Sequence, residues 1–122
     1  MRLSRGKKRT EVTLEAERFG SDLVVRIFNG NAHVGAVAVA DYDAGHATTS
    51  VSVITRIGHK EDRIARNAAC RISKAFGKPV CVVAGIHLEK ATRDEIRKLV
   101  RNSAAAVSAF IRTAAIQDVP QP

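Results

Sequence analysis

The chain has 122 residues, enough for one domain with a single core and too few for two independent ones. Its apolar fraction of 45% is ordinary for a globular protein, and no apolar run approaches the roughly 20 residues of a membrane span, which excludes a spanning protein. The 20 Lys and Arg against 12 Asp and Glu give a formal charge of +8, which favours anionic partners such as phosphates, cofactors, acidic proteins or nucleic acid.

Two terminal segments are predicted to lie outside the domain. Residues 1–9 form a basic stretch with no apolar segment behind it, which indicates a flexible basic arm and argues against a signal peptide. Residues 118–122 look like a flexible tail, so the single domain is expected to span residues 10–117. Cys70 and Cys81 do not form a recognisable disulfide framework, which favours free thiols and a cytoplasmic location.

The first half of the chain has the period of β-strands. Apolar and polar residues alternate over residues 10–19 and 47–57, which predicts a strand in each. Residues 23–28 and 33–40 are predicted as two more strands, because turn signals bound them. Turn formers separate them, most clearly Asn29-Gly30-Asn31, because Asn and Gly tolerate positive φ. We expect these four strands to form an antiparallel meander.

The second half contains two predicted helices. Residues 62–76 keep helical spacing of apolar positions, and Gly77 ends this helix while Pro79 prevents its continuation. Thr92 and Glu95 form a capping box that opens a second helix, whose helical spacing persists to about residue 116.

Residues 80–86, between the helices, are a nearly continuous apolar run, typical of a strand covered on both faces. The order ββββαβα predicts an α+β fold of two layers, with a mostly antiparallel five-stranded sheet and two helices on one face. Residues 33–40 and 80–86 carry small or apolar side chains on both faces of that sheet. The uncovered face would therefore expose an apolar patch, which predicts a homodimer through the sheet or its edge.

Three of the four histidines are predicted to meet at one edge of the sheet. A right-handed crossover from residues 47–57 to residues 80–86 places the carboxyl ends of both strands together. His59 and His87 follow those ends, each near a glycine. Antiparallel pairing brings His33 to the same edge and leaves His46 at the far end.

This edge has the chemistry of an anion-binding site. The carboxyl ends of strands are a common binding crevice, and the start of a helix offers unpaired amides and a positive dipole that suit a phosphate. Lys60 supplies a full charge, Gly58 permits close approach of the backbone, and Gly85 is expected to leave open space beside His87. Hydroxyls along the floor are expected from Ser50, Ser52 and Thr55.

Catalysis and metal binding have weaker support. Three histidines permit a metal site, but the short ligand pairs HxH, HExxH and CxxC do not occur in the sequence. No serine stands on a GxSxG turn, and the common nucleotide motifs GxGxxG and GxxxxGK[ST] are missing. We therefore predict no catalytic residue and no metal. Taken singly, His59 is as well explained as a solvated residue at a helix start, and Gly58 and His33 are better explained as turn residues. His87 is the best single case for a site, because it directly follows the apolar run of residues 80–86.

The motifs of this edge also resemble a known family. The sequence resembles the small D-type component of gallate decarboxylase and its relatives in four segments: residues 33–40, the Thr49-Ser50 pair, residues 58–61, and residues 85–87 followed by a capped helix. The resemblance covers about residues 11–116 and leaves the basic arm outside.

The resemblance implies a function and a fold. Members of this family are understood as chaperones for reduced prenylated FMN, which they pass to the apo forms of decarboxylases that use it. Their fold resembles that of the proteasome assembly chaperones, two-layer α+β proteins that pair as dimers. By motif position the resemblance implicates His33, Gly35, Gly58, His59, Lys60, Gly85 and His87.

The leading hypothesis is a non-enzymatic, cytoplasmic, homodimeric chaperone that binds reduced prenylated FMN and helps load it into a partner aromatic-acid decarboxylase. The alternatives are a basic nucleic-acid-binding or protein-assembly module and a small metal-dependent enzyme that uses His33, His59 and His87. The predicted cofactor-binding residues are His33, Gly35, Ser50, Gly58, His59, Lys60, Gly85 and His87.

Overall fold

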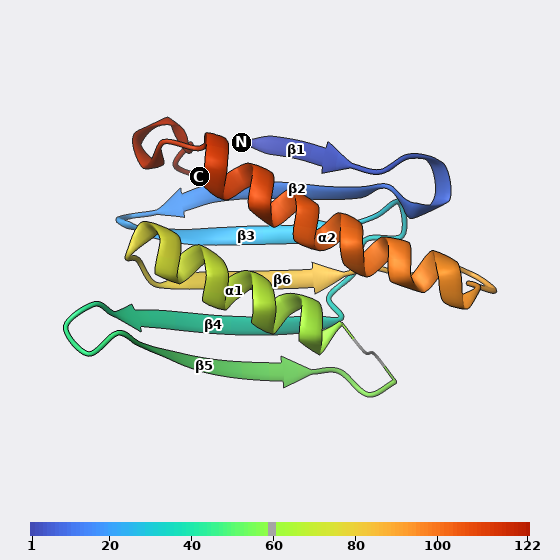
Figure 1. Ribbon diagram of the computed structural model, residues 1–122, viewed down its shortest axis with the longest axis horizontal. Helices are drawn as coiled ribbons and strands as arrows, with labels where there is room; N and C mark the ends of the chain where they lie inside the picture. The colour runs from blue at the N-terminus through green and yellow to red at the C-terminus, as the bar shows by residue number, and fades with distance from the viewer. Residues whose placement is uncertain (59–60) are drawn as a thin grey trace.

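The computed structural model describes residues 1–58 and 61–122, so His59 and Lys60 lie outside the described residues. In chain order the elements are β1 (Arg2–Arg5), η1 (Lys8–Thr10), β2 (Val12–Phe19), β3 (Asp22–Phe28), β4 (Ala36–Asp43), β5 (Thr48–Thr55), α1 (Asp62–Phe76), β6 (Val80–Gly85), α2 (Arg93–Thr113) and η2 (Ile116–Asp118). The helices α1 and α2 lie together on one face of a single sheet, which confirms the α+β class and the two layers (Figure 1).

The sheet has six strands in the order β1-β2-β3-β6-β4-β5, where five were predicted. Neighbouring strands are antiparallel except β3 and β6, which are parallel, so the sheet is mixed. The predicted meander is wrong because β6 lies between β3 and β4. A strand that is apolar on both faces is stabilised most in the middle of a sheet, where both neighbours and the helix layer cover it.

The sixth strand, β1, comes from the segment predicted as a flexible arm. Arg2–Arg5 pair antiparallel with the first half of β2. The Ser4 and Thr13 hydroxyls are 2.9 Å apart, and the Arg2 Nη1 lies 2.9 Å from the Glu15 Oε2. Alternation over four residues is too short to predict a strand, and its charged side chains face solvent, so sequence patterns do not reveal this sheet edge.

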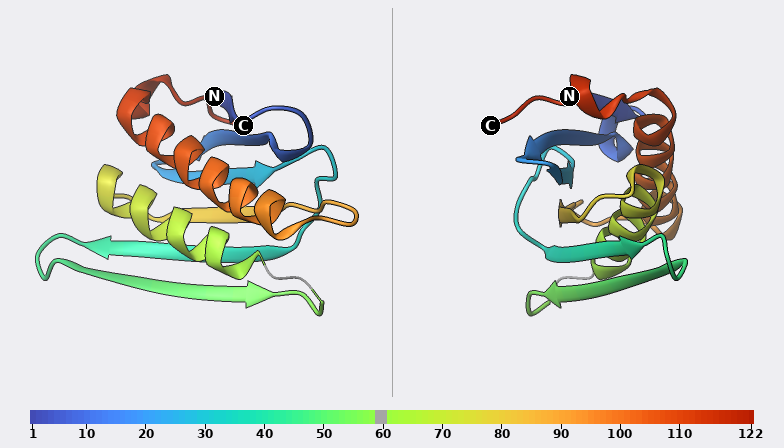
Figure 2. Two further views of the ribbon diagram at one scale, coloured as in Figure 1. Left: turned by 45° about the vertical axis from the view of Figure 1, so that its right-hand side comes forward. Right: turned by 90° about the vertical axis from the view of Figure 1, so that its left-hand side faces the viewer.

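The C-terminal segment, predicted as a flexible tail, packs beside β2. The Arg18 backbone N–H donates to the Pro120 carbonyl at 2.7 Å, and the Arg18 Nε donates to the Val119 carbonyl at 2.7 Å. The Gln121 side-chain amide bonds in both directions to the backbone of Gly20. Because Val119 is fully buried, this segment completes the core at the edge where β1 lies. Figure 2 shows both termini at this edge of the sheet.

The core lies between the sheet and the helices. Helix α1 covers β4, β5 and β6, and α2 crosses β1 and β2. One face of every inner strand is buried there, and the Phe76 and Phe110 rings join the two helices at a centroid distance of 5.4 Å. Gly77 ends α1 with φ of 64°, and the Thr92 and Glu95 capping box opens α2, both as predicted. Of the helices that the structure describes, none has the length and apolar character to cross a membrane.

The opposite face of the sheet carries the apolar patch expected from the sequence. Its side chains alternate with the buried core positions along four adjacent strands, and we call them the open-face stripe: Val24, Val37, Val39, Ile54, Cys81 and Val83. Val39 is 49% exposed and Ile54 is 74% exposed. Beside the stripe, Arg26 pairs with Glu15 and Glu17, so the patch is bordered by charge.

Candidate functional site

The strand ends predicted to converge do so. Ala36, the first residue of β4, pairs with Thr55 of β5 on one side and with Ala84 of β6 on the other. The carboxyl ends of β5 and β6 therefore flank the start of β4, beside the start of α1 (Figure 1). Strand β4 starts later than predicted, so His33 lies in the loop before it.

His33 is held between two segments. Its Nδ1 lies 2.8 Å from the Asn31 carbonyl oxygen, and its Nε2 lies 3.0 Å from the Glu61 Oε1. Glu61 is the N-cap residue of α1, and its side chain is only 9% exposed. The pair joins the loop before β4 to the start of α1. It also places a buried carboxylate at the helix start, where the sequence predicted room for a phosphate.

Two glycines of this edge let other segments of the chain pack closely against them. A Cβ on Gly85 would overlap the backbone carbonyl of His33, and a Cβ on Gly35 would come within 2.5 Å of the Glu61 carboxylate. The expectation that Gly85 leaves open space beside His87 is therefore wrong. These two glycines allow close packing of β6, the loop before β4 and α1.

We expect Gly85→Ala to destabilise the protein by about 3 kcal/mol, because a rigid backbone group blocks the new methyl. Gly30→Ala is the matched control, since a Cβ there has nothing within 4 Å. Thermal unfolding of wild type and both variants measures the difference. Equal melting temperatures for Gly85→Ala and Gly30→Ala would show that the backbone at this edge shifts to admit the methyl group at little cost in stability.

His87 is tied to the same loop as His33. The His87 carbonyl accepts from the Asn29 Nδ2 at 2.7 Å and from the Asn31 Nδ2 at 3.1 Å. Its ring Nε2 lies 2.8 Å from the Glu89 Oε1, and the side chain is 55% exposed. His33 and His87 therefore belong to one hydrogen-bonded corner, as the strand directions predicted. We call it the histidine corner.

The other predicted site residues are placed differently. Gly58 is exposed with φ of 78°, as a turn requires, and the expectations for His59 and Lys60 fall outside the described residues. Ser50 is not at this corner, because it pairs with Asp41 toward the far end of the β4-β5 hairpin. It lines a shallow depression there with Asp41, Asp43, His46 and Thr48.

Sequence reasoning missed a basic loop, residues 6–10, at the same corner. The Arg9 Nη2 donates to the Glu89 carbonyl at 2.9 Å, and the Arg9 Nε lies 3.0 Å from the Glu95 Oε2. Two hydrogen bonds lower the pKa of Glu95: the one from Arg9 has the larger effect, and the one from the Thr92 backbone the smaller. Because Glu89 also contacts His87, the loop borders the histidine corner. The run of cations is visible in the sequence, but its position is not.

Two adjacent cavities open at this corner. The first, which we call the N-terminal crevice, has a volume of ≈ 470 Å³ and is lined by Arg2, Lys8, Arg9, Glu11, Thr13, Phe28, Asn29, Gly30, Asn31 and Leu88. The second, which we call the open-face hollow, measures ≈ 350 Å³ and is lined by Glu15, Arg26, Ile27, Phe28, Ala32, His33, Val34, Val83 and Gly85. Phe28 lines both cavities, so the two are neighbours. The lining of the N-terminal crevice contains three cations, whereas the lining of the open-face hollow is mainly apolar.

The histidine corner offers two imidazoles that contact carboxylates. Within residues 1–58 and 61–122, no group of three His, Cys, Asp or Glu side chains could hold a metal ion. The metal hypothesis also required His59, which lies outside the described residues. Both His33 and His87 face carboxylates, an arrangement that orients the imidazoles.

Comparison with known families decides the relationship. The model of the prenylated flavin chaperone LpdD-like domain matches residues 6–115 of this chain. The chain belongs to the prenylated flavin chaperone LpdD-like family. This confirms the resemblance seen in the sequence. The match begins at Gly6, so the basic loop, which the sequence resemblance left outside, lies within the LpdD-like domain. As a member of a chaperone family, the protein is not an enzyme.

A solved structure supports the fold of this LpdD-like protein. It matches a chain from the crystal structure of a chaperone complex for yeast 20S proteasome assembly, with a TM-score of 0.56 and 16% sequence identity over 92% of each chain. At that identity the likeness concerns the fold, which is the proteasome assembly chaperone-like fold expected for the family. None of the curated proteins matches the chain.

Proposed function

We propose that this protein binds reduced prenylated FMN and helps load it into a partner aromatic-acid decarboxylase. The observation that carries the proposal is the family match, which spans residues 6–115 and includes the whole histidine corner. The convergence of His33 and His87 beside two cavities that share Phe28 in their linings supports it. The cofactor supplies the decarboxylation chemistry in the enzyme that receives it, and the chaperone's residues hold it.

The residues of the corner fit such a ligand. Reduced prenylated FMN combines a flat apolar ring with an anionic phosphate tail. The open-face hollow offers apolar walls from Phe28, Val34 and Val83, and the N-terminal crevice offers cations. Both volumes lie in the range of small-molecule sites, about 300–1,000 Å³.

The proposed binding residues have different roles. His87 presents a polar group to the ligand, and His33, whose two ring nitrogens are held by Asn31 and Glu61, borders it with the ring. Gly35 and Gly85 shape the corner by letting its segments approach. Gly58, His59 and Lys60 remain proposed contacts at the start of α1 on the strength of their motif position. Ser50 is not part of the proposal, because it lies at the other end of β5.

We also propose that two copies pair through the open-face stripe. Val39 and Ile54 lie on one continuous apolar face and are largely exposed, and pairing would remove both from water. Val83 belongs to the stripe and also lines the open-face hollow, so a second copy would border the bound ring with aliphatic side chains. A cytoplasmic location stays a prediction from the two free cysteines.

Anaerobic titration tests the proposed function. The flavin absorbance of reduced prenylated FMN should change saturably as protein is added, to a limit of one ligand per chain. Reduced FMN serves as the comparison ligand, and stronger binding of the prenylated form is expected. Absence of saturable binding would refute the proposal.

A further inference from the structure

The basic loop is built onto α2. Gly6 has φ of +83°, and a Cβ there would overlap the Asn102 side-chain amide. The Asn102 Nδ2 in turn donates to the Thr10 carbonyl at 2.8 Å. Together with the contacts of Arg9, these interactions hold residues 6–10 in one position. The loop therefore presents its remaining cations from a fixed backbone.

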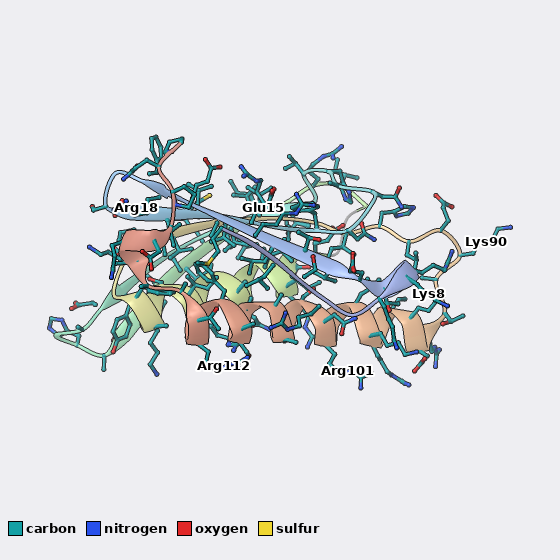
Figure 3. All side chains as sticks on the ribbon, turned by 90° about the horizontal axis from the view of Figure 1, so that it is seen from above. Lys8, Glu15, Arg18, Lys90, Arg101 and Arg112 are labelled. Atoms are coloured by element: carbon teal, nitrogen blue, oxygen red, sulfur yellow. The ribbon has the colours of Figure 1, made fainter. Side chains whose placement is uncertain are left out.

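Of the two loop cations that line the N-terminal crevice, Lys8 is the one that this arrangement leaves available. Arg9 is used by Glu89 and Glu95, whereas the Lys8 ammonium forms no ion pair with any residue in the described part of the chain. Lys8 has φ of 56°, a left-handed conformation that is costly for a lysine and is kept only where the surroundings impose it. Figure 3 shows Lys8 and Lys90 at the same end of the molecule.

Arg2 also lines the crevice. Its Cζ is 5.6 Å from the centroid of the Phe28 ring, and its Nη1 pairs with the Glu15 Oε2 at 2.9 Å. The lining of the crevice thus contains the guanidinium of Arg2, the ammonium of Lys8 and the neutral amides of Asn29 and Asn31. Glu11 is the acidic residue of the lining, outnumbered by the three cations.

We propose that the N-terminal crevice holds the phosphate of the cofactor, with Lys8 as its cationic partner and Arg2 as a second donor through the guanidinium N–H groups that Glu15 does not use. This inference rests on the proposed function. The ring then extends past Phe28 into the open-face hollow, toward His33. The start of α1 is the less favourable seat, because the buried Glu61 side chain, which contacts His33, already lies there. A phosphate monoester pairs strongly with clustered cations that are already in position.

A phosphate-specific comparison tests this inference. Wild-type protein and Lys8→Gln are titrated anaerobically with reduced prenylated FMN and with its dephosphorylated form, reduced prenylated riboflavin. Lys8→Gln should weaken binding of the phosphorylated ligand about tenfold and leave binding of the dephosphorylated one unchanged. Arg2→Gln should have the same selective effect, although Arg2 also supports β1. Arg112→Gln, an exposed cation at the opposite end of α2, is the matched control and should bind like wild type (Figure 3).

The outcomes separate the two proposals. Wild-type binding of the phosphorylated ligand with no difference between Lys8→Gln and Arg112→Gln would overturn the phosphate seat and leave the proposed function standing. Equal losses for both ligands in Lys8→Gln would also overturn it, because the residue would then act through folding. If wild type binds neither ligand, the proposed function itself fails.

Discussion

His87→Ala is expected to weaken binding of reduced prenylated FMN about tenfold or more. His87 is half exposed at the corner, and the contact of its Nε2 with Glu89 orients the ring, so an oriented imidazole is open to a ligand. The backbone of His87 carries the hydrogen bonds from Asn29 and Asn31, and the substitution leaves these in place. The loss should therefore be one of affinity, about 1.4 kcal/mol for each tenfold, with little change in melting temperature.

His46→Ala is the matched control for this experiment. His46 is also exposed and paired with a carboxylate, Asp43, at 2.7 Å, but it lies at the far end of the β4-β5 hairpin. Its replacement should leave affinity unchanged. His33→Ala should lose both affinity and stability, because His33 contacts the buried Glu61 carboxylate. If His87→Ala and His46→Ala bind equally well, the histidine corner is not the binding site.

Ile54→Glu is expected to convert a dimer into a monomer. A carboxylate buried in an apolar interface loses its hydration without gaining a partner, which costs several kcal/mol per copy. Size-exclusion chromatography with light scattering should give twice the 13.1 kDa chain mass for wild type and the single mass for the variant. Val39→Glu, on the neighbouring strand β4, should act in the same way.

Val100→Glu provides the control, because Val100 is as exposed as Val39, at 49%, but lies on the helix layer. It should remain a dimer. Cys81 gives a second readout from within the open-face stripe: burial raises the pKa of its thiol, so little thiolate is present at neutral pH. Alkylation of Cys81 should be slower in wild type than in Ile54→Glu. A wild-type monomer, or a dimeric Ile54→Glu, would contradict pairing through this face.

The convergence of the strand ends could be predicted from sequence because it depends on period and handedness. A helix between two strands makes their directions agree, and an antiparallel partner then brings the loop of His33 to the same edge. The order of the strands in the sheet could not be predicted in this way. Local patterns show that residues 80–86 are covered on both faces, but they do not say which strands lie on either side, so they do not reveal the position of β6 between β3 and β4.

The details of the site depend on contacts between distant segments. A glycine in a sequence indicates a close approach without naming the group that approaches, and at Gly85 that group is the His33 carbonyl. The same reasoning applies to the basic loop. Its cations are plain in the sequence, yet only the packing of Gly6 on Asn102 and of Arg9 on Glu95 places Lys8 beside the histidine corner.

Transfer of the cofactor tests the central claim most directly. The protein is loaded anaerobically with reduced prenylated FMN, freed of unbound ligand and mixed with the apo form of a decarboxylase that uses this cofactor. The proposal predicts that decarboxylase activity appears as the ligand leaves the chaperone, faster than with the same concentration of free cofactor, and that His87→Ala gives no such advantage. If the loaded protein retains its ligand, or activates the decarboxylase no better than free cofactor, the protein does not deliver prenylated FMN.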